Sequence, residues 1–173
     1  NNIKMPRISL RDVILPLKDK IFRIALRITL NRAEAEDIVQ DTMIRVCNKR
    51  NEWSELESGD AFCITVTKNL AIDRIQNKEA QNIPIQENMT EQFLVSGPYE
   101  ELISHERLEI IHNLINELPE KQRTIMQLRD IEGESHKKIA EFLKIPEEQV
   151  KVYLFRARQK VRQKYNEIEK YGL

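Results

Sequence analysis

The sequence is poor in the residues that mark disulfide-rich, metal-binding or membrane-spanning proteins. Its 173 residues include two cysteines and four glycines, and aromatic residues make up only 6%. Cys47 and Cys63 show no CxxC spacing, so we expect no disulfide framework and no zinc site, with both thiols packed as small apolar groups. No apolar run could span a bilayer and no signal-peptide pattern is present, which predicts a cytoplasmic protein. Because the first residue is Asn1 rather than methionine, we expect the native start to be missing or altered.

Charge and helical periodicity dominate what the sequence does contain. Charged residues make up 32% of the chain, and 28 basic residues balance 28 acidic ones, so the formal net charge is zero. Together with the scarcity of glycine, this composition favours helices over strands. Because the net charge is zero, attraction to a charged partner must come from charge that is segregated along the chain. No lysine or arginine lies between Glu79 and Arg107, whereas the chain turns basic beyond Val150.

Three helices are predicted in the first half of the chain. Apolar residues recur at three- and four-residue steps from Leu10 to Ile28, and Pro16 should kink that helix or mark a fresh start. Asn31 is a suitable cap for a second helix. A third helix is expected from about Asp60 to Lys78. Much of its buried surface should come from Phe62, Val66, Leu70, Ile72 and Ile75.

A second helical unit follows a segment in which the periodicity fades. Pro84, Gly97 and Pro98 interrupt any long helix there. We therefore predict an all-α fold of two small helical domains, residues 8–81 and 99–170, joined by a flexible linker over residues 82–98. The core of the second domain is expected from Leu102, Ile103, Leu108, Ile111, Leu114, Ile125, Met126, Leu128, Ile139, Phe142, Leu143, Val150 and Leu154.

The last third of the chain reads as a short apolar helix, a tight turn and a long basic helix. Pro119 should start the preceding helix, Gly133 should relieve the turn after it, and Ser135 should cap the next one. This order is typical of a helix-turn-helix, whose second helix enters the major groove of DNA. Its lysines and arginines would neutralise phosphates. The alternative is an ordinary amphipathic helix with a solvated basic face.

Six residues of the basic helix are candidates for contact with DNA: Gln149, Lys151, Val152, Phe155, Arg156 and Arg158. Lys151 and Arg158 suit phosphates, and Gln149 suits either purpose. The other three suit base edges, because arginine can donate a bidentate pair to guanine and apolar side chains can meet a thymine methyl group.

Sequence blocks in both halves resemble the extracytoplasmic-function sigma factors, small bacterial subunits that direct transcription initiation. The block LPEKQRTIMQLRDIEGESHKKIAEFLKIPEEQVKVYLFRARQKVR is similar to region 4 of that family, which recognises the minus-thirty-five promoter element. The blocks AEAEDIVQDTMIRV and AFCITVTKNLAIDRI are similar to region 2, which binds core RNA polymerase and opens the minus-ten element. The blocks occur in the family's order, and the resemblance spans residues 10 to 165.

The resemblance implies roles for two sets of residues in the first half. Core polymerase binding is implied for Asp37, Gln40 and Asp41, which share a helical face by their spacing. Without the resemblance, a solvated acidic face would explain them. Contact with the minus-ten element is implied for Lys68, Asn69 and Arg74. The two cations can bind phosphate, whereas Asn69 can read a base edge or cap a local backbone group.

The resemblance also concerns two loops and the turn before the basic helix. It places a loop for a flipped base between Asn51 and Asp60, where Trp53 would either stack on that base or anchor the core. The acidic linker would thread through polymerase channels near the template. Lys144 stands where the family commonly has glycine, and Pro146 where it has a serine or threonine cap. Proline is tolerated at a helix start, so these departures affect the register of base contacts rather than the fold.

The resemblance implies an alternative sigma factor that binds core RNA polymerase and promoter DNA, and that aids strand opening without being an enzyme. An anti-sigma factor is a further partner implied by many family members, and nucleoid association is expected when the protein is bound to polymerase. We expect no small-molecule substrate, cofactor or metal, because His105, His112 and His136 read as scattered surface residues and the acids as helix-surface residues. Two alternatives stay open: an autonomous repressor or activator that binds duplex operators, and a helical adaptor that binds only proteins.

Overall fold

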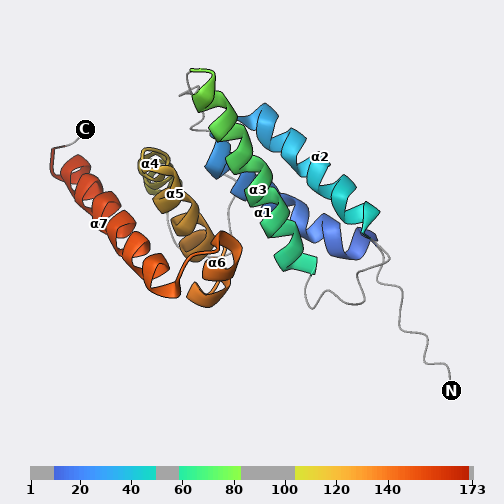
Figure 1. Ribbon diagram of the computed structural model, residues 1–173. Coiled ribbons are helices and arrows are strands. Elements are labelled where there is room, and N and C mark those ends of the chain that lie inside the picture. Colours follow the sequence, from blue (N-terminus) through green and yellow to red (C-terminus); the bar gives the residue numbers. More distant parts are fainter. Residues whose placement is uncertain (1–9, 50–58, 83–103, 172–173) are drawn as a thin grey trace.

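The structure is a computed structural model that describes residues 10–49, 59–82 and 104–171, and every regular element in these ranges is helical. The first unit consists of α1 (Leu10–Thr29), α2 (Arg32–Asn48) and α3 (Gly59–Ala80). The second consists of α4 (His105–Asn116), α5 (Glu120–Met126), the π-helical turn η3 (Gln127–Ile131), α6 (His136–Leu143) and α7 (Glu147–Tyr171). In Figure 1 the first three helices form one group, and α4 and α5 lie between that group and α7. The predicted all-α fold with a C-terminal helix-turn-helix is confirmed.

The helices of the first unit follow the predicted order. Asn31 caps α2, because its side-chain oxygen accepts a hydrogen bond from the backbone N–H of Glu34 at 3.1 Å. The helix α1 runs on through Pro16, so the fresh start predicted there does not occur. Pro16 is exposed, where water can satisfy the carbonyl group that proline leaves without a donor.

The buried side of α3 differs from the predicted one. Cys63, Ile64 and Ala71 are fully buried, and so is Thr67, whose hydroxyl lies 3.2 Å from that of Thr42 on α2. The residues expected to be buried are only half-buried: Phe62, Val66, Leu70, Ile72 and Ile75. The reason is that α3 contacts α1, α2 and α6, so that a wide strip of the helix is covered rather than one narrow stripe.

The helix-turn-helix of the second unit consists of α6 and α7. Ser135 caps α6 by accepting a hydrogen bond from the backbone N–H of Lys138 at 3.1 Å, and Gly133 has the positive φ of 76° expected for the preceding turn. After α6, Lys144 adopts the left-handed conformation with φ 53° and ψ 46°. Pro146 then precedes α7, and its carbonyl accepts a hydrogen bond from the backbone N–H of Gln149 at 2.9 Å. The position at which the family commonly has glycine is therefore in the left-handed conformation in this chain, where Lys144 occupies it.

Each unit has a small core of its own, and a larger core is shared between the units. The core of the first unit contains Ile21, Val39, Val46 and Cys63. That of the second contains Leu114, Ile115, Leu118, Met126, Ile131, Ala157 and Val161. The shared cluster includes Ile24, Ile28, Ile38 and Ile64 from the first unit, and Ile125, Leu128, Ile139, Phe142, Val150 and Leu154 from the second. The sequence predicted two helical domains but not that they pack against one another.

Arg27 of α1 lies at the centre of the contact between the units. Its side chain is only 1% exposed, and its Nε donates a hydrogen bond to Oε1 of Gln127 at 2.8 Å. Its Nη1 donates to Oδ1 of Asn116 at 2.5 Å, and its Nη2 donates to Nδ1 of His112. A guanidinium group has no acceptor, so Nδ1 of His112 accepts this bond and the ring is neutral.

A second buried arginine approaches the same place from the other unit. Arg123 of α5 donates from Nε to the main-chain oxygen of Arg27 at 2.6 Å, and from Nη2 to that of Ile28 at 2.9 Å. Its Nη1 donates to the main-chain oxygen of Leu118 at 2.9 Å. The carbonyls of Arg27 and Ile28 belong to the C-terminal end of α1, where carbonyl groups lack partners within the helix. Arg123 therefore caps α1 from the neighbouring unit.

Three expectations about polar residues are wrong. His112, expected at the surface, is buried because it accepts the hydrogen bond from Arg27. Glu132 and Glu134, grouped with acids on helix surfaces, are buried because they pair with cations of α1. Cys47 is exposed on α2, where it lies outside the packed face, whereas Cys63 is buried as predicted.

Replacing Lys144 with glycine is expected to stabilise the protein by about 1 kcal/mol, because a residue with Cβ costs about 1–2 kcal/mol in the left-handed region. The measurement is the free energy of unfolding from chemical denaturation. Lys144→Ala is the matched control, since it removes the charge but keeps Cβ. Equal gains from the two variants would trace the effect to the lysine charge and not to the backbone.

Cys47 is expected to react with an alkylating reagent at pH 8 in the native protein, and Cys63 to stay protected. Burial, and secondarily the charge of Asp60, raise the pKa of Cys63 to about 11, so its thiol stays protonated and unreactive at pH 8. Mass spectrometry of the alkylated protein gives both rates. Alkylation of Cys63 as fast as that of Cys47 before unfolding would contradict the packing of α3 described above.

Candidate nucleic-acid and polymerase interfaces

The six residues predicted to contact DNA all lie on the exposed side of α7. The opposite side is buried and consists of Val150, Leu154, Ala157 and Val161. By helical spacing, the exposed residues form two rows. One row contains Gln149, Val152 and Arg156, and the other contains Lys151, Phe155 and Arg158. We call the two rows together the α7 reading face.

Two apolar side chains on the α7 reading face are unusually exposed. Phe155 is 67% exposed and Val152 is 46% exposed. They alternate with cations, and Arg156 makes no ion pair among the residues that the structure describes. Exposed apolar groups beside this arginine suit a partner that presents both phosphates and base edges.

The second row of the reading face borders an open groove of about 480 Å³ between α6 and α7. The groove is lined by His136, Lys151, Leu154, Phe155, Arg158, Gln159 and Arg162. Arg158 is held at this edge by Asp130 of η3, to which its Nε and Nη2 donate at 3.0 Å and 2.5 Å. These hydrogen bonds raise the pKa of Arg158, although partial burial opposes them. Arg158 is therefore the most firmly oriented cation of the row.

The predicted polymerase-binding residues meet a predicted minus-ten residue on the surface of the first unit. Asp37 and Gln40 of α2 are exposed, and Asp41 is half-buried. Arg74 of α3 donates to Oδ2 of Asp37 at 2.5 Å and to Oδ2 of Asp41 at 3.2 Å. The structure thus brings Asp37, Asp41 and Arg74 into contact, and Gln40 shares the helix face of the two acids by its spacing. We call these four residues the α2–α3 ridge.

The other two predicted minus-ten residues lie in different environments on α3. Asn69 is exposed, whereas Lys68 is only 7% exposed. Burial lowers the pKa of Lys68, and repulsion from Lys144 of the second unit lowers it further, against the attraction of Glu120 and Asp73. Lys68 therefore faces the second unit in this arrangement.

Several functional expectations fall outside the described residues. They concern Trp53 and most of the loop predicted to receive a flipped base, and the greater part of the linker. Within the described ranges, no group of three or more histidine, cysteine, aspartate or glutamate side chains is placed to hold a metal ion. None of the helices there is long and apolar enough to cross a membrane.

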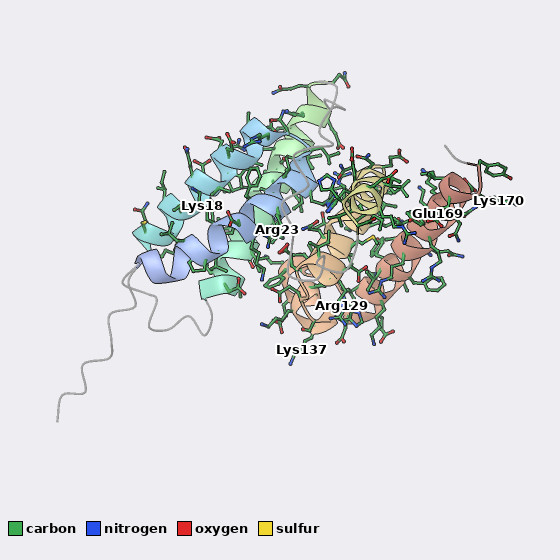
Figure 2. The ribbon with its side chains drawn as sticks, turned by 180° about the vertical axis from the view of Figure 1, so that it is seen from behind. Lys18, Arg23, Arg129, Lys137, Glu169 and Lys170 are labelled. Carbon is green, nitrogen blue, oxygen red and sulfur yellow. The ribbon has the colours of Figure 1, made fainter. Side chains whose placement is uncertain are left out.

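Sequence reasoning missed the polar residues that join the two units. Arg23 and Arg27 interrupt an otherwise apolar helical pattern at a four-residue spacing, and that interruption is the signal that could have marked them. Figure 2 shows side chains filling the space between the units, with Arg23 among them, whereas Glu169 and Lys170 lie at the far end of α7. No local signal marks Glu132 and Glu134, because the partners of these two acids are distant in the sequence.

Two family comparisons match separate parts of the chain. Residues 13–81 match the family Sigma-70 region 2, and residues 108–161 match the family Sigma-70, region 4. The first match contains the α2–α3 ridge, and the second contains the helix-turn-helix with the α7 reading face. Together the matches cover more than half of the chain.

Similar proteins align with most of the chain. The ECF RNA polymerase sigma factor SigW of Bacillus subtilis is 30% identical over 166 residues, which are 91% of this chain and 89% of SigW. The ECF RNA polymerase sigma-E factor of Haemophilus influenzae is 26% identical over 153 residues, 78% of this chain and 76% of that protein.

A solved structure shares the fold. It is that of the sigma factor RpoE in complex with the anti-sigma factor NepR from Bartonella quintana, which matches with a TM-score of 0.73 at 18% identity. The match covers 93% of this chain and 98% of that one. From the family matches and the relatives, the chain belongs to the ECF sigma factors, the alternative subunits that bind core RNA polymerase and direct promoter-specific transcription initiation.

Proposed function

We propose that the two surfaces described above have different binding roles in this sigma factor. The α7 reading face would recognise the minus-thirty-five element. The α2–α3 ridge would bind core polymerase through Asp37, Gln40 and Asp41, and Lys68, Asn69 and Arg74 would contact the minus-ten element. The domains would be residues 8–81 for region 2, 82–98 for the linker and 99–170 for region 4.

The observation that carries the proposal is the combination of exposed apolar and cationic side chains on α7. A helix that only covered a core would gain nothing from exposing Phe155 at 67% and Val152 at 46% beside arginines. In the major groove the same groups would contact thymine methyl groups, guanine and phosphates. The formal net charge of zero gives no general attraction to DNA, so recognition of the minus-thirty-five element must come from a local surface such as this face.

The two rows of the reading face are suited to different tasks. Arg156 lies free of ion pairs among the described residues, beside Val152 and Gln149, and this row can read base edges. Arg158 already donates two hydrogen bonds to Asp130 of η3, so its side chain is held in place and suits a phosphate at a fixed position. Lys151, at the start of the same row, would contact the adjacent phosphate.

Arg74 would act on the α2–α3 ridge in two ways. Its ion pairs hold the carboxylates of Asp37 and Asp41 in place for polymerase. When promoter DNA approaches, the same guanidinium can exchange one carboxylate for a phosphate. The ridge would thereby couple polymerase binding to contact with the minus-ten element.

The protein would act as a regulatory subunit and would leave phosphodiester chemistry to the polymerase. The protein would then act in the cytoplasm, and on the nucleoid when it is bound to polymerase. An anti-sigma factor is a fitting further partner, because the structurally similar RpoE was solved in complex with one.

Arg156→Ala is expected to weaken binding to the cognate promoter by about 1–3 kcal/mol and to relax specificity at one base position. The measurement is the affinity of the sigma–polymerase complex for a promoter library substituted at each position. Lys151→Ala is the control, since loss of a phosphate contact should weaken all sequences alike and reduce the salt slope by about 1. Equal losses on every sequence for Arg156→Ala would refute base reading.

Replacing Asp37 and Asp41 with asparagine is expected to weaken association with core polymerase at least tenfold, because two charge-assisted contacts worth about 1.5–3 kcal/mol each would be lost. Binding to a minus-thirty-five duplex should not change. Glu36→Gln is the control, since this exposed acid of α2 pairs with Arg32 and lies outside the ridge. Core affinity unchanged in the double variant would remove polymerase binding from these residues.

In vitro transcription with purified bacterial core polymerase and a genomic fragment library tests the function as a whole. Initiation at specific promoters that depends on the added protein is the expected result. Specific duplex binding by the protein alone, without core association or initiation, would identify an autonomous regulator instead.

A further inference from the structure

Basic side chains from two helices line the groove between α6 and α7. Lys151 and Arg158 belong to the α7 reading face, but Arg162 of α7 and His136, the first residue of α6, do not. The basic row from Lys151 to Arg162 covers about 17 Å of α7, at about 1.5 Å per residue. The groove therefore extends the basic surface beyond the reading face, both along α7 and across to α6.

The groove also has apolar walls. Leu154 is buried, Phe155 is 67% exposed, and both line the groove. A free inorganic anion would gain nothing from these two side chains, whereas a DNA strand alternates phosphates with the carbon atoms of deoxyribose. Lys151, Phe155 and Arg158 line the groove and also belong to the reading face. The mixed lining and this continuity favour the backbone of the promoter as the occupant.

The position of α6 supports the same occupant. In a helix-turn-helix the second helix lies in the major groove of DNA, and the first helix crosses the backbone. Here α6 is the first helix, and His136 lies at its start. A strand that passes α6 would therefore lie beside the groove when α7 is in the major groove.

The permanent cations of the groove are available to a phosphate. Lys151 lies 3.6 Å from Oε1 of Glu148, and their side chains are 48% and 86% exposed, so this surface ion pair is weak. Arg158 donates to Asp130 from Nε and Nη2, which leaves the two donors of Nη1 for a ligand. Arg162 is exposed and forms no ion pair with any residue that the structure describes. All three cations can therefore take a phosphate without breaking the contact that holds Arg158.

His136 is the groove residue whose charge changes with pH. Histidine gains or loses its charge between about pH 5 and about pH 8, unlike lysine and arginine. The residue is half-buried, and its ring forms no hydrogen bond with the part of the chain that the structure describes, so the ring nitrogens are available to a ligand. A hydrogen bond to a phosphate is stronger when the donor carries a charge. The imidazolium would therefore bind a phosphate more tightly than the neutral ring.

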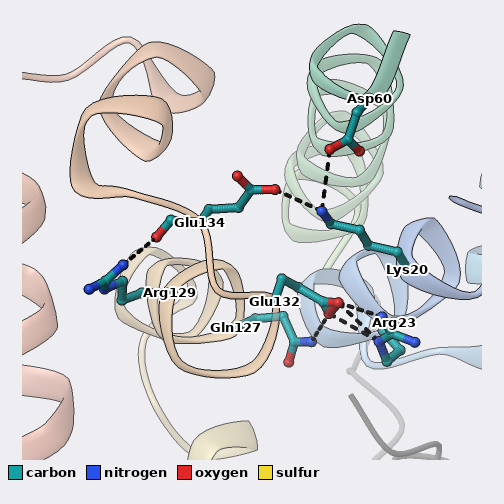
Figure 3. A network of polar contacts seen from close by, with 7 residues as sticks. All are labelled: Lys20, Arg23, Asp60, Gln127, Arg129, Glu132 and Glu134. Carbon is teal, nitrogen blue, oxygen red and sulfur yellow. Dashed lines mark hydrogen bonds and ion pairs between the residues drawn. The ribbon is translucent and has the colours of Figure 1, made fainter. Parts of the chain in front are cut away.

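Acids behind His136 are paired away from the groove. Glu134, two residues earlier, directs its carboxylate to Lys20 of α1 at 2.7 Å, and Arg129 donates to its main-chain oxygen at 2.9 Å, as Figure 3 shows. Asp60 of α3 lies 3.5 Å from the same lysine. These two acids are therefore engaged with α1 and do not neutralise the groove.

On the groove side, the ring of His136 faces cations of α7. They are Lys151, Arg158 and Arg162. Asp130 of η3 is held by Arg158. The charged residues of α6 itself are exposed: Lys137, Lys138 and Glu141. A phosphate among these cations would supply the negative charge that favours the imidazolium, so binding would take up a proton and would strengthen as the pH falls.

We propose that the groove between α6 and α7 binds the sugar–phosphate backbone of the promoter beside the minus-thirty-five element, and that His136 makes this contact pH-dependent. Promoter recognition by region 4 then strengthens as the pH falls from about 8 to about 6. The proposal rests on the proposed function in one respect, the assignment of the α7 reading face to that element. The groove and its lining residues are defined by the structure alone.

The test is the affinity of the holoenzyme, assembled from the full-length protein and core polymerase, for a duplex of a promoter found by in vitro transcription. Binding is measured at pH 6 and pH 8 over a range of salt concentrations. Between these pH values the wild type is expected to gain about fivefold more affinity than His136→Gln, because the variant keeps a neutral donor at both. The salt slope of the wild type should also be steeper by about 0.9 at pH 6, since one more phosphate is neutralised.

Two further variants separate the charge of His136 from a structural effect. His136→Lys is charged at both pH values, so it should bind tightly at pH 8 and gain little at pH 6. His105→Gln is the matched control, because His105 is also an exposed first residue of a helix after a serine, and it should keep the wild-type pH dependence. His112 is present in every variant, so its own titration cancels. Should His136→Gln fail to fold, the comparison of the wild type with His136→Lys decides.

Single methylphosphonates in the duplex locate the contact. A neutral methylphosphonate at the phosphate in the groove should remove the extra affinity of the wild type at pH 6, and should cause no pH-dependent loss in His136→Gln. Inorganic phosphate, added at the molar concentration of the duplex phosphates, should not compete. Competition at that concentration would assign the groove to a free phosphate compound and overturn the proposal.

Failure of the groove proposal is distinguishable from failure of the proposed function. The same pH dependence in the wild type and in folded His136→Gln, with promoter-specific initiation intact, would overturn the groove proposal and leave the sigma function standing. A chain that initiated at no promoter would remove the proposed function. The pH dependence of duplex binding by the protein alone, compared between the wild type and His136→Gln, would then decide the role of the groove.

Discussion

The buried guanidinium of Arg27 is the constraint on which the arrangement of the two units depends. An isolated charge of this size in an apolar interior would be prohibitive, so its donors must find acceptors. The acceptors come from the other unit: Gln127, Asn116 and His112. Because His112 and Asn116 lie on α4 and Gln127 lies on η3, Arg27 fixes both elements relative to α1 at once. An apolar residue in its place could tolerate sliding between the units, but this arginine cannot.

The secondary structure could be predicted because its causes are local. Asn31 and Ser135 cap the helices that follow them, and the apolar spacing in α1 and α7 places the core sides of these helices. The recognition of both regions came from sequence blocks that are each continuous in the chain. For the same reason, the exposed positions of Asp37, Gln40 and the α7 residues agree with a surface role.

The relation between the units could not be predicted from such patterns. In the sequence alone, Glu132 looks like any acid in a turn. Its partner Arg23 lies more than a hundred residues earlier in the chain. His112 likewise looks like a surface histidine in the sequence, because nothing near it shows that its ring will accept a hydrogen bond from Arg27. The burial of Lys68 likewise depends on the turn at Lys144, which the linear sequence keeps far away. Interactions of this kind arise from packing, and the spacing of residues within one helix does not tell which distant residue each of them contacts.

The π-helical turn η3 sets the rotational phase of everything that follows it. Its hydrogen bond runs from the backbone N–H of Glu132 to the carbonyl of Gln127 at 3.0 Å, which accommodates one residue more than an α-helical turn would. If Gln127–Ile131 adopted ordinary α-helical geometry with the same number of residues, the subsequent chain would be rotated by about 100°. Glu132 would then point away from Arg23, and Asp130 away from Arg158. This short segment is therefore a place where the length of the chain, more than its composition, is under physical constraint.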